Sequence, residues 1–137
     1  MPAPEPAKRL TDLELEIMQL VWDAHPQAIT VRDVVERMSA LGRELAYTTL
    51  QTMMTILTKK GVLGVRPGPG RAHEYRARIS RSEARTTMTE DFLARLFGGE
   101  AQPLLAHLLE HESMSRGELE ELRRKIDSQL LDEEEMR

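Results

Sequence analysis

The sequence contains no cysteine and few aromatic residues, which make up 4% of its 137 residues. The lack of cysteine excludes disulfides, thiolate metal sites, iron–sulfur clusters and cysteine nucleophiles. No hydrophobic run approaches the roughly 18–20 residues that a membrane-spanning helix requires. Residues 1–10 also lack the apolar segment of a secretion signal. We therefore expect a soluble cytoplasmic protein without membrane insertion.

The residue sets of common active sites are missing as well. The chain shows no glycine-rich phosphate loop, no serine–histidine–aspartate set and no paired buried carboxylates. We predict that the protein is not an enzyme and that it has no cofactor and no metal site. Its 40% hydrophobic and 31% charged residues are typical of a globular protein. The length suits one compact domain, or a small domain with an accessory element.

Charge is distributed unevenly along the chain, whose overall net charge is −4. Residues 1–79 carry a net charge of +2, whereas residues 80–137 carry −6. The positive excess is concentrated in residues 43–79, where seven basic and two acidic residues give +5. Such a block is typical of contact with phosphates, but a solvated surface patch has the same composition. The pattern of the surrounding helices has to distinguish the two.

Two short helices are predicted in the first third of the chain. Thr11 and Glu14 form a capping box for a helix that ends near residue 24, and hydrophobic residues on two of its sides indicate a central position. Thr30 caps a second helix over about residues 31–41. The predicted buried stripe of this second helix consists of Val31, Val34, Val35, Met38 and Leu41.

A third helix, predicted over residues 47–60, has an unusual polar side. One clean hydrophobic face is formed by Leu50, Met53, Met54 and Leu57. The opposite face consists of Thr48, Thr52, Thr55 and Lys59, flanked by Gln51 and Thr58. Threonine is a mediocre helix former, so this composition indicates a role other than helix stability.

A β-hairpin is predicted to follow, with strands over residues 62–66 and 72–78 around a Pro-Gly-Pro-Gly turn. Residues 27–29 can add one short strand. The order helix, short strand, helix, helix, hairpin is that of a winged helix-turn-helix. Residues 47–60 would then be the recognition helix.

The last 58 residues are predicted to be helical, with capping boxes at Ser80 and Ser115 and a break at residues 98–99. Three short helices bury little of their own surface. We therefore expect their hydrophobic stripes to meet a second copy of the chain. The predicted homodimerisation residues are Phe92, Leu96, Leu104, Leu105, Leu108, Leu119, Leu122, Ile126 and Leu130.

The predicted fold is thus mainly α with a small β-hairpin. It comprises a mobile tail over residues 1–9, a winged helix-turn-helix DNA-binding domain over 10–79 and a three-helix dimerisation region over 80–137. The predicted partner is double-stranded DNA, because threonine and amide side chains contact base edges in the major groove and basic residues contact phosphates. The predicted DNA-binding residues are Arg43, Tyr47, Thr48, Thr49, Gln51, Thr52, Thr55, Lys59, Arg66, Arg71 and His73, with Lys60 and Arg76 as further phosphate contacts.

Residues 107–111 match the H-x-x-E-H motif of a group of zinc proteases. A catalytic zinc requires a third protein ligand and a cleft. The downstream glutamates belong to a charged helix surface or to the acidic end of the chain. A solvated helix surface explains the motif better than a zinc hydrolase does, and incidental zinc binding by His107 and His111 is the remaining alternative.

Several stretches resemble the penicillinase-repressor family (BlaI/MecI/CopY). They are residues 16–23 (EIMQLVWD), 47–61 (beginning YTTLQT), 71–75 (RAHEY), 92–99 (FLARLFGG) and 117–123 (GELEELR). The resemblance covers about residues 10–130. It implies a dimeric repressor with an N-terminal winged helix and a C-terminal dimerisation region. Such a repressor would bind palindromic promoter operators and control antibiotic-resistance, copper-export or related stress genes.

The resemblance also bears on how such a repressor would be released. Copper-responsive members carry a C-terminal cysteine cluster for Cu(I), so the lack of cysteine excludes that mode here. Members that respond to β-lactams are cut in the second dimerisation helix, by or downstream of a membrane sensor-protease. The equivalent bond is His107–Leu108, where well-known members have asparagine before the cut. A membrane sensor-protease is therefore a candidate partner.

The residues alone also leave another function open. A winged-helix module could use the threonine face of residues 47–60 to bind a protein partner, without specific DNA recognition.

Overall fold

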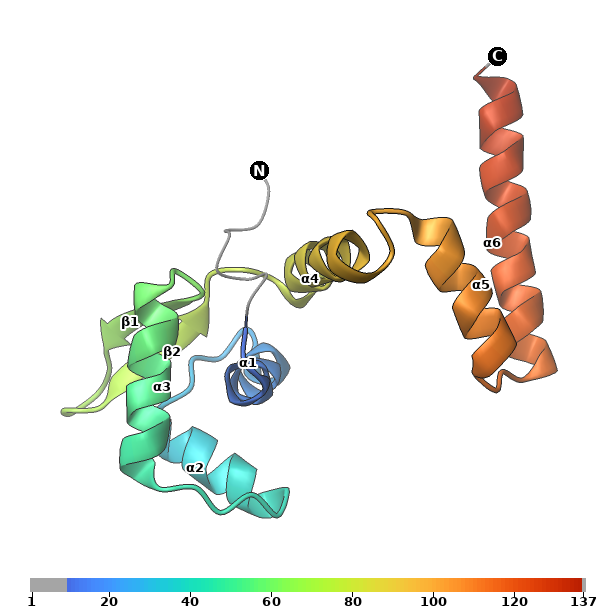
Figure 1. Cartoon of the computed structure of the whole chain (residues 1–137). Helices are drawn as coiled ribbons and strands as arrows, with labels where there is room; N and C mark the ends of the chain where they lie inside the picture. Colours follow the sequence, from blue (N-terminus) through green and yellow to red (C-terminus); the bar gives the residue numbers. More distant parts are fainter. Residues whose placement is uncertain (1–9, 137) are drawn as a thin grey trace. The chain divides into compact units, whose positions relative to one another are not determined.

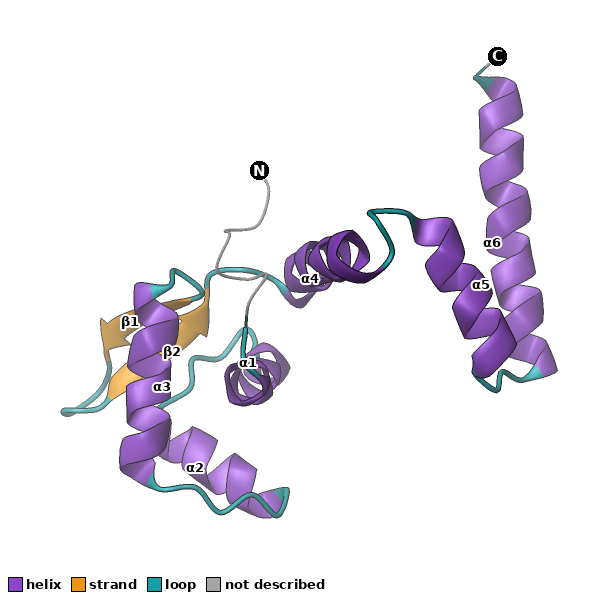
Figure 2. Ribbon diagram, in the orientation of Figure 1, coloured by secondary structure: helices purple, strands orange, loops and turns teal. Residues whose placement is uncertain are grey.

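The computed structural model describes residues 10–136, so the predicted tail over residues 1–9 lies outside the described residues. Two compact units are present: the winged-helix unit, which ends at Phe92, and the C-terminal unit, which begins at Leu93. Figure 1 and Figure 2 show the elements. In chain order they are α1 (Asp12–Ala24), α2 (Val31–Ala40), α3 (Tyr47–Lys59), β1 (Leu63–Pro67), β2 (His73–Ala77), α4 (Arg81–Leu96), α5 (Ala101–His111) and α6 (Arg116–Glu135).

Helices α1 and α2 both begin at capping boxes; the sequence predicts the box at α1 and a Thr30 cap at α2. The hydroxyl oxygen of Thr11 accepts a hydrogen bond from the N–H of Glu14 at 3.2 Å, and the Glu14 carboxylate accepts one from the N–H of Thr11 at 2.9 Å. Thr30 and Asp33 make the equivalent pair at α2. Each box satisfies two N–H groups that a helix start would otherwise leave without partners.

The end of α2 differs from the prediction. The helix stops at Ala40, and Gly42 adopts a positive φ of 82° that turns the chain toward α3. Leu41 was predicted to be buried, but its exposed fraction is 69%. The prediction was wrong because Leu41 lies beyond the last helical residue, where the 3.6-residue periodicity no longer sets the direction of the side chain.

The predicted hairpin is present and forms the wing. Strands β1 and β2 pair antiparallel, with Val65 opposite Tyr75 and Pro67 opposite His73. The predicted short strand at residues 27–29 is reduced to a single bridge. In that bridge the N–H of Ile29 donates to the carbonyl of Tyr75 at 3.0 Å, and the N–H of Tyr75 donates back at 2.8 Å. The wing is therefore tied to the segment that precedes α2.

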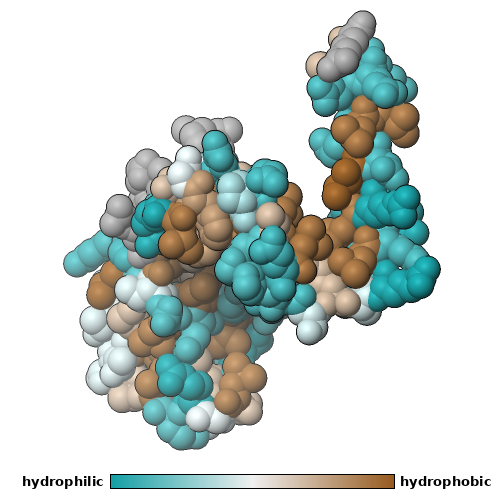
Figure 3. All heavy atoms as spheres, turned by 45° about the vertical axis from the view of Figure 1, so that its right-hand side comes forward, coloured by the Kyte–Doolittle hydropathy of each residue, from teal (hydrophilic) through white to brown (hydrophobic). Residues whose placement is uncertain are grey.

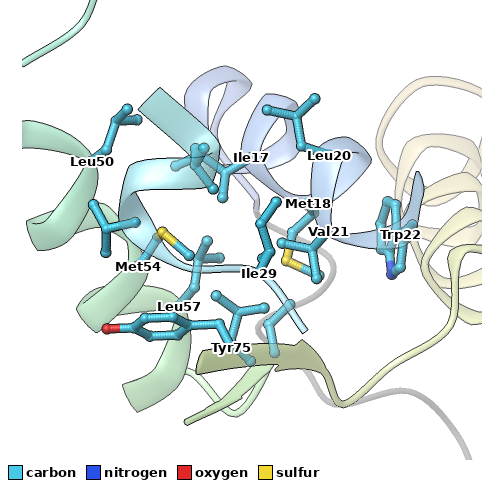
Figure 4. Packing of buried hydrophobic residues seen from close by; sticks show 14 of the residues in the cluster. Ile17, Met18, Leu20, Val21, Trp22, Ile29, Leu50, Met54, Leu57 and Tyr75 are labelled. Atoms are coloured by element: carbon cyan, nitrogen blue, oxygen red, sulfur yellow. The ribbon is translucent and has the colours of Figure 1, made fainter. Parts of the chain in front are cut away.

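The winged-helix unit encloses one hydrophobic core to which every one of its elements contributes (Figure 4). Residues of α1 occupy its centre, which confirms the central position predicted for that helix. The hydrophobic face of α3 covers one side of the core and the wing strands contribute residues from another. The buried residues include Ile17, Met18, Val21, Ile29, Val34, Met38, Leu50, Met54, Leu57, Val62, Leu63 and Tyr75. This packing leaves the threonine side of α3 at the surface.

The beginning of α4 belongs to the same unit. The indole N–H of Trp22 donates to the carbonyl of Ile79 at 3.0 Å, directly before α4. The guanidinium of Arg81 lies 5.6 Å from the centre of the indole ring and is paired with Asp23 at 2.6 Å. Ala84, one turn further, is buried. These contacts join the first turns of α4 to the end of α1.

The C-terminal unit contains α5 and α6, and no residue of either helix is buried. Ser115 and Glu118 form the predicted capping box at the start of α6. Hydrophobic side chains gather along one side of these helices (Figure 3). A groove of about 300 Å³ between α5 and α6 is lined by Leu105, Leu108, Leu109, Met114, Leu122, Lys125, Ile126 and Gln129.

Candidate nucleic-acid interface

The surface of α3 opposite the core carries most of the predicted DNA-binding side chains. Because Leu50, Met54 and Leu57 are fully buried, the helix is fixed with one face outward. The predicted residues on the outward side are all exposed: Tyr47, Thr48, Thr49, Gln51, Thr52, Thr55 and Lys59. The Thr55 hydroxyl donates to the carbonyl of Gln51 at 2.9 Å, which orients that side chain along the helix. A row of short polar side chains on a projecting helix suits the floor of a major groove.

The N-terminus of α3 has an uncapped first turn. Ala46 occupies the N-cap position and its methyl side chain makes no capping hydrogen bond, in contrast to Thr11 and Thr30 at the starts of α1 and α2. The first N–H groups of a helix have no partner within the helix and carry partial positive charge. The start of α3, at Thr48 and Thr49, therefore offers donors to an anion such as a DNA phosphate.

A hollow of about 410 Å³ lies beside the first turns of α3. It is lined by Thr30, Val31, Arg32, Tyr47, Gln51, Arg71, Ala72, His73 and Tyr75. Four of the residues predicted from the sequence meet here, two from α3 and two from the turn end of the wing: Tyr47, Gln51, Arg71 and His73. We call this site the α3–wing hollow. Tyr75 is buried at this site, and burial raises the pKa of its phenol, with a further contribution from Tyr47.

Arg32 also lines the α3–wing hollow, although it was not among the residues predicted from the sequence. Arg32 lies in the first turn of α2 and is exposed. In a helix-turn-helix the first of the two helices crosses the DNA backbone. The signal was therefore available, because the second residue of the predicted helix that precedes the recognition helix is a cation.

Two of the other predicted contacts lie apart from the hollow. Arg43 follows α2 and its guanidinium pairs with Glu16 of α1 at 3.2 Å. Arg66 lies on β1 opposite Glu74 and lines a separate depression of the wing together with Arg76 and Arg78. The wing thus presents basic side chains at more than one place.

Two residues predicted to contact phosphates have structural partners. The Lys60 ammonium pairs with the buried carboxylate of Glu14, at 2.8 and 2.9 Å from its two oxygens. Arg76 donates to the carbonyl of Pro26 at 2.7 Å. Local sequence patterns do not predict these bonds, because the acceptors lie 46 and 50 residues away.

These pairings change the charge that the basic block presents. Glu14 and Glu16 lie outside residues 43–79 but neutralise Lys60 and Arg43 within that block. Counting them lowers the net charge of the block from +5 to +3. The charge that remains lies on the C-terminal end of α3 and on the wing, at Lys59, Arg66, Arg71, Arg76 and Arg78.

The two histidines of the H-x-x-E-H motif lie on the exposed surface of α5. Their rings are 4.4 Å apart at an angle of 37°, and His111 Nε2 lies 3.9 Å from a carboxylate oxygen of Glu110. Within residues 10–136 no group of three or more histidine, aspartate or glutamate side chains could hold a metal ion. In that same range no helix has the length and hydropathy needed to cross a membrane.

The arrangement of α2, α3 and the β1–β2 wing defines a winged helix-turn-helix, which confirms the predicted fold. The chain belongs to the penicillinase repressor family, because the sequence profile described as Penicillinase repressor matches residues 10–128. This family consists of transcriptional repressors, which are not enzymes. The resemblance seen in the sequence is thereby confirmed, and with it the prediction of a non-enzymatic protein.

Individual relatives show the same likeness. The chain is 39% identical over 121 residues to the Transcriptional regulator BlaI of Mycobacterium tuberculosis (strain ATCC 25618 / H37Rv), a match that covers 86% of this chain and 83% of the relative. It is 24% identical over 114 residues to the Methicillin resistance regulatory protein MecI of Mammaliicoccus sciuri, covering 83% and 89%. The solution structure of the DNA binding domain of the repressor BlaI is 29% identical with a TM-score of 0.47, and the match covers 61% of this chain and 93% of that chain.

Proposed function

We propose that the protein is a homodimeric transcriptional repressor that binds palindromic promoter operators through α3 and the wing. The observation that carries this proposal is the α3 surface, where an uncapped first turn and a row of exposed threonines lie beside the α3–wing hollow. In this arrangement Thr48, Thr49, Gln51, Thr52 and Thr55 approach base edges or the nearest phosphates. Residues Tyr47, Arg71 and His73 line the path of the backbone, while Lys59, Arg66 and Arg43 border it.

Support for a homodimer comes from the C-terminal helices. The exposed hydrophobic side chains of this region include Phe92, Leu96, Leu105, Leu119, Leu122, Ile126 and Leu130. Leu104 and Leu108 are half-buried. A symmetric dimer would cover this surface and would place two α3 helices against half-sites separated by whole turns of DNA. The dimerisation region of the proposal begins at residue 80 and the DNA-binding domain spans residues 10–79.

The proposed target genes are based on the names of the relatives. Because relatives carry the names Methicillin resistance regulatory protein and Penicillinase repressor, we include antibiotic-resistance and stress genes among the proposed targets.

Release by a membrane sensor-protease is part of the proposal. The His107–Leu108 bond lies within α5, and cleavage there would detach α6 from the rest of the chain. The test is mass spectrometry of the protein from inducer-treated cells, where a fragment ending at His107 is expected; an intact chain would contradict this part of the proposal.

The DNA-binding roles can be separated by a salt titration. Sites selected from random DNA should contain a palindrome. Gln51→Ala or Thr52→Ala should weaken binding to the selected site by about 1–3 kcal/mol and relax the preference at one base position. Arg71→Ala should weaken binding to all sequences alike and lower the slope of log K against log salt by about one. The matched control is Arg85→Ala, an exposed arginine of α4 on the same unit.

The outcome also tests the alternative function. A protein-interaction module would select no palindrome and would show no steep salt dependence. If Gln51→Ala and Arg71→Ala both reduced affinity without changing base preference, the division of roles along α3 and the wing would be wrong.

A further inference from the structure

The ion pair between Glu14 and Lys60 lies at the end of α3 that is remote from the α3–wing hollow. The Glu14 side chain is 1% exposed, whereas that of Lys60 is 31% exposed. Both carboxylate oxygens accept a hydrogen bond from the Lys60 ammonium, at 2.9 and 2.8 Å. One of the two, Oε1, also accepts the bond from the N–H of Thr11. A buried carboxylate with this many donors is held in one place.

Each partner stands at a junction between elements. Glu14 belongs to the capping box of α1, so its backbone and its side chain are both fixed at the start of the central helix. Lys60 is the C-cap of α3, and its N–H donates to the carbonyl of Ile56 at 2.9 Å. Gly61 then turns the chain with a φ of 81°, and β1 begins at Leu63. The ion pair therefore connects α1 to the segment in which α3 ends and the chain continues into the wing.

We propose that Glu14 and Lys60 are positioning residues for DNA recognition, which fix α3 and the first wing strand against α1 without contacting DNA. This inference rests on the proposed function. Because Lys60 is paired with a rigid, buried acceptor on α1, the pair fixes the position of the C-terminal end of α3 relative to α1. It also fixes the direction in which the chain leaves α3 toward β1. Loss of Lys60 leaves the buried Glu14 carboxylate uncompensated, and loss of the Glu14 carboxylate removes the acceptor that holds the partly exposed Lys60. In either case the end of α3 would be free to shift relative to α1.

Two other roles of Lys60 make different predictions. If Lys60 were a phosphate contact, its removal would lower the salt slope of DNA binding, and removal of Glu14 would not weaken binding. If the pair only stabilised the fold, its removal would lower the unfolding free energy but leave the affinity of the folded protein unchanged. A positioning pair lowers the affinity of the folded protein at an unchanged salt slope.

The experiment is a double-mutant cycle on the full chain with Glu14→Gln, Lys60→Gln and the double variant. The selected operator is titrated over a series of salt concentrations, at a temperature where circular dichroism shows every variant to be folded. Lys59→Gln is the matched control, because Lys59 is the neighbouring exposed lysine on the same end of α3. Lys60→Arg retains the charge and the reach, and it keeps the test valid if a neutral variant fails to fold.

Each single variant of the pair is expected to weaken operator binding about tenfold, with an unchanged salt slope, and the double variant should be no weaker than either. Lys59→Gln should lower the salt slope by about one. Lys60→Arg should bind nearly as well as the wild type. These results together would support the positioning role.

The inference is overturned by a salt slope that falls with Lys60→Gln while Glu14→Gln binds normally, or by additive losses in the double variant. It is equally overturned if the folded variants bind the operator with wild-type affinity. Failure of the proposed function is a separate result, since the wild type itself would then select no operator, and this inference would fail with it.

Discussion

The winged-helix unit buries many of its hydrophobic residues in a core, whereas the C-terminal unit leaves those of α5 and α6 unburied. In the first, residues from α1, α2, α3, the wing and α4 close one core around Ile17 and Met18, both of which are fully buried. In the second, α5 and α6 bury no residue, and Ile126 and Leu130 have exposed fractions of 57% and 55%. The hydrophobic core of the first unit is closed within a single chain, whereas the second unit leaves a hydrophobic surface uncovered, as an interaction site would.

The difference suggests that the two units have different functions, presentation of α3 in the first and association in the second. A rigid unit suits the presentation of α3, because base contacts depend on a fixed helix orientation. An uncovered hydrophobic stripe suits association, and in the proposed dimer that association would set the spacing of two such units on DNA. The charge follows the same division, with the basic block on the first unit and most of the net negative charge on the helices that follow.

The largest effect is expected from a charge in the uncovered stripe. Ile126→Asp should weaken the proposed dimer by about 3–6 kcal/mol, because each of the two copies loses a side chain whose burial is worth about 1.5–3 kcal/mol. Sedimentation equilibrium measures the association, and hydrogen exchange of α1–α3 should remain unchanged. Ser128→Asp is the control, because it adds the same carboxylate to another side of α6. Equal dissociation by both variants would show that the stripe is not the interface.

A somewhat smaller effect is expected in the closed core. Met54 is fully buried, so Met54→Ala should lower the free energy of unfolding of the winged-helix unit by about 2–5 kcal/mol. Urea denaturation followed by circular dichroism measures the loss. Thr48→Ala, on the exposed side of the same helix, should stay within about 0.5 kcal/mol. A loss of dimerisation in Met54→Ala at temperatures where it is folded would argue against independent units.

The smallest of these effects concerns acid. Burial raises the pKa of Glu14, but the hydrogen bonds from Lys60 and Thr11 outweigh it, so the pKa lies below its ordinary value of 4.5. The unfolded chain therefore binds this proton more readily, and the stabilisation is present above pH 4.5 and is lost as the pH falls through the folded-state pKa. Urea midpoints between pH 6 and pH 3 should fall less steeply in Glu14→Gln than in the wild type. Identical slopes would refute this origin of the acid sensitivity.

Helix starts and the winged-helix order could be predicted from the sequence because their determinants are local. Thr11, Ser80 and Ser115 each have a glutamate three positions later, and all three form the predicted capping boxes. The hairpin was predictable from its Pro-Gly turn. The face of α3 followed from the spacing of Leu50, Met54 and Leu57.

What the sequence did not show depends on contacts across the fold. Lys60 looks like a surface cation until α1 supplies Glu14 from 46 residues away. Arg32 comes near Gln51 and His73 only because the starts of α2 and α3 lie beside the turn end of the wing. The prediction that Leu41 is buried was wrong for a different reason, because a periodic pattern does not show at which residue the helix ends.

Trp22 gives the chain an internal optical reporter. It is the only tryptophan in the sequence, and its indole is hydrogen-bonded to Ile79 and stacked beneath Arg81, at the join between α1 and α4. Intrinsic fluorescence of the unlabelled protein therefore has a single origin. Detachment of α4 from α1 would expose the indole and shift its emission to the red, whereas separation of the C-terminal helices alone would leave the emission unchanged. Movement of α4 relative to the end of α1 can therefore be followed by intrinsic fluorescence, without an added dye.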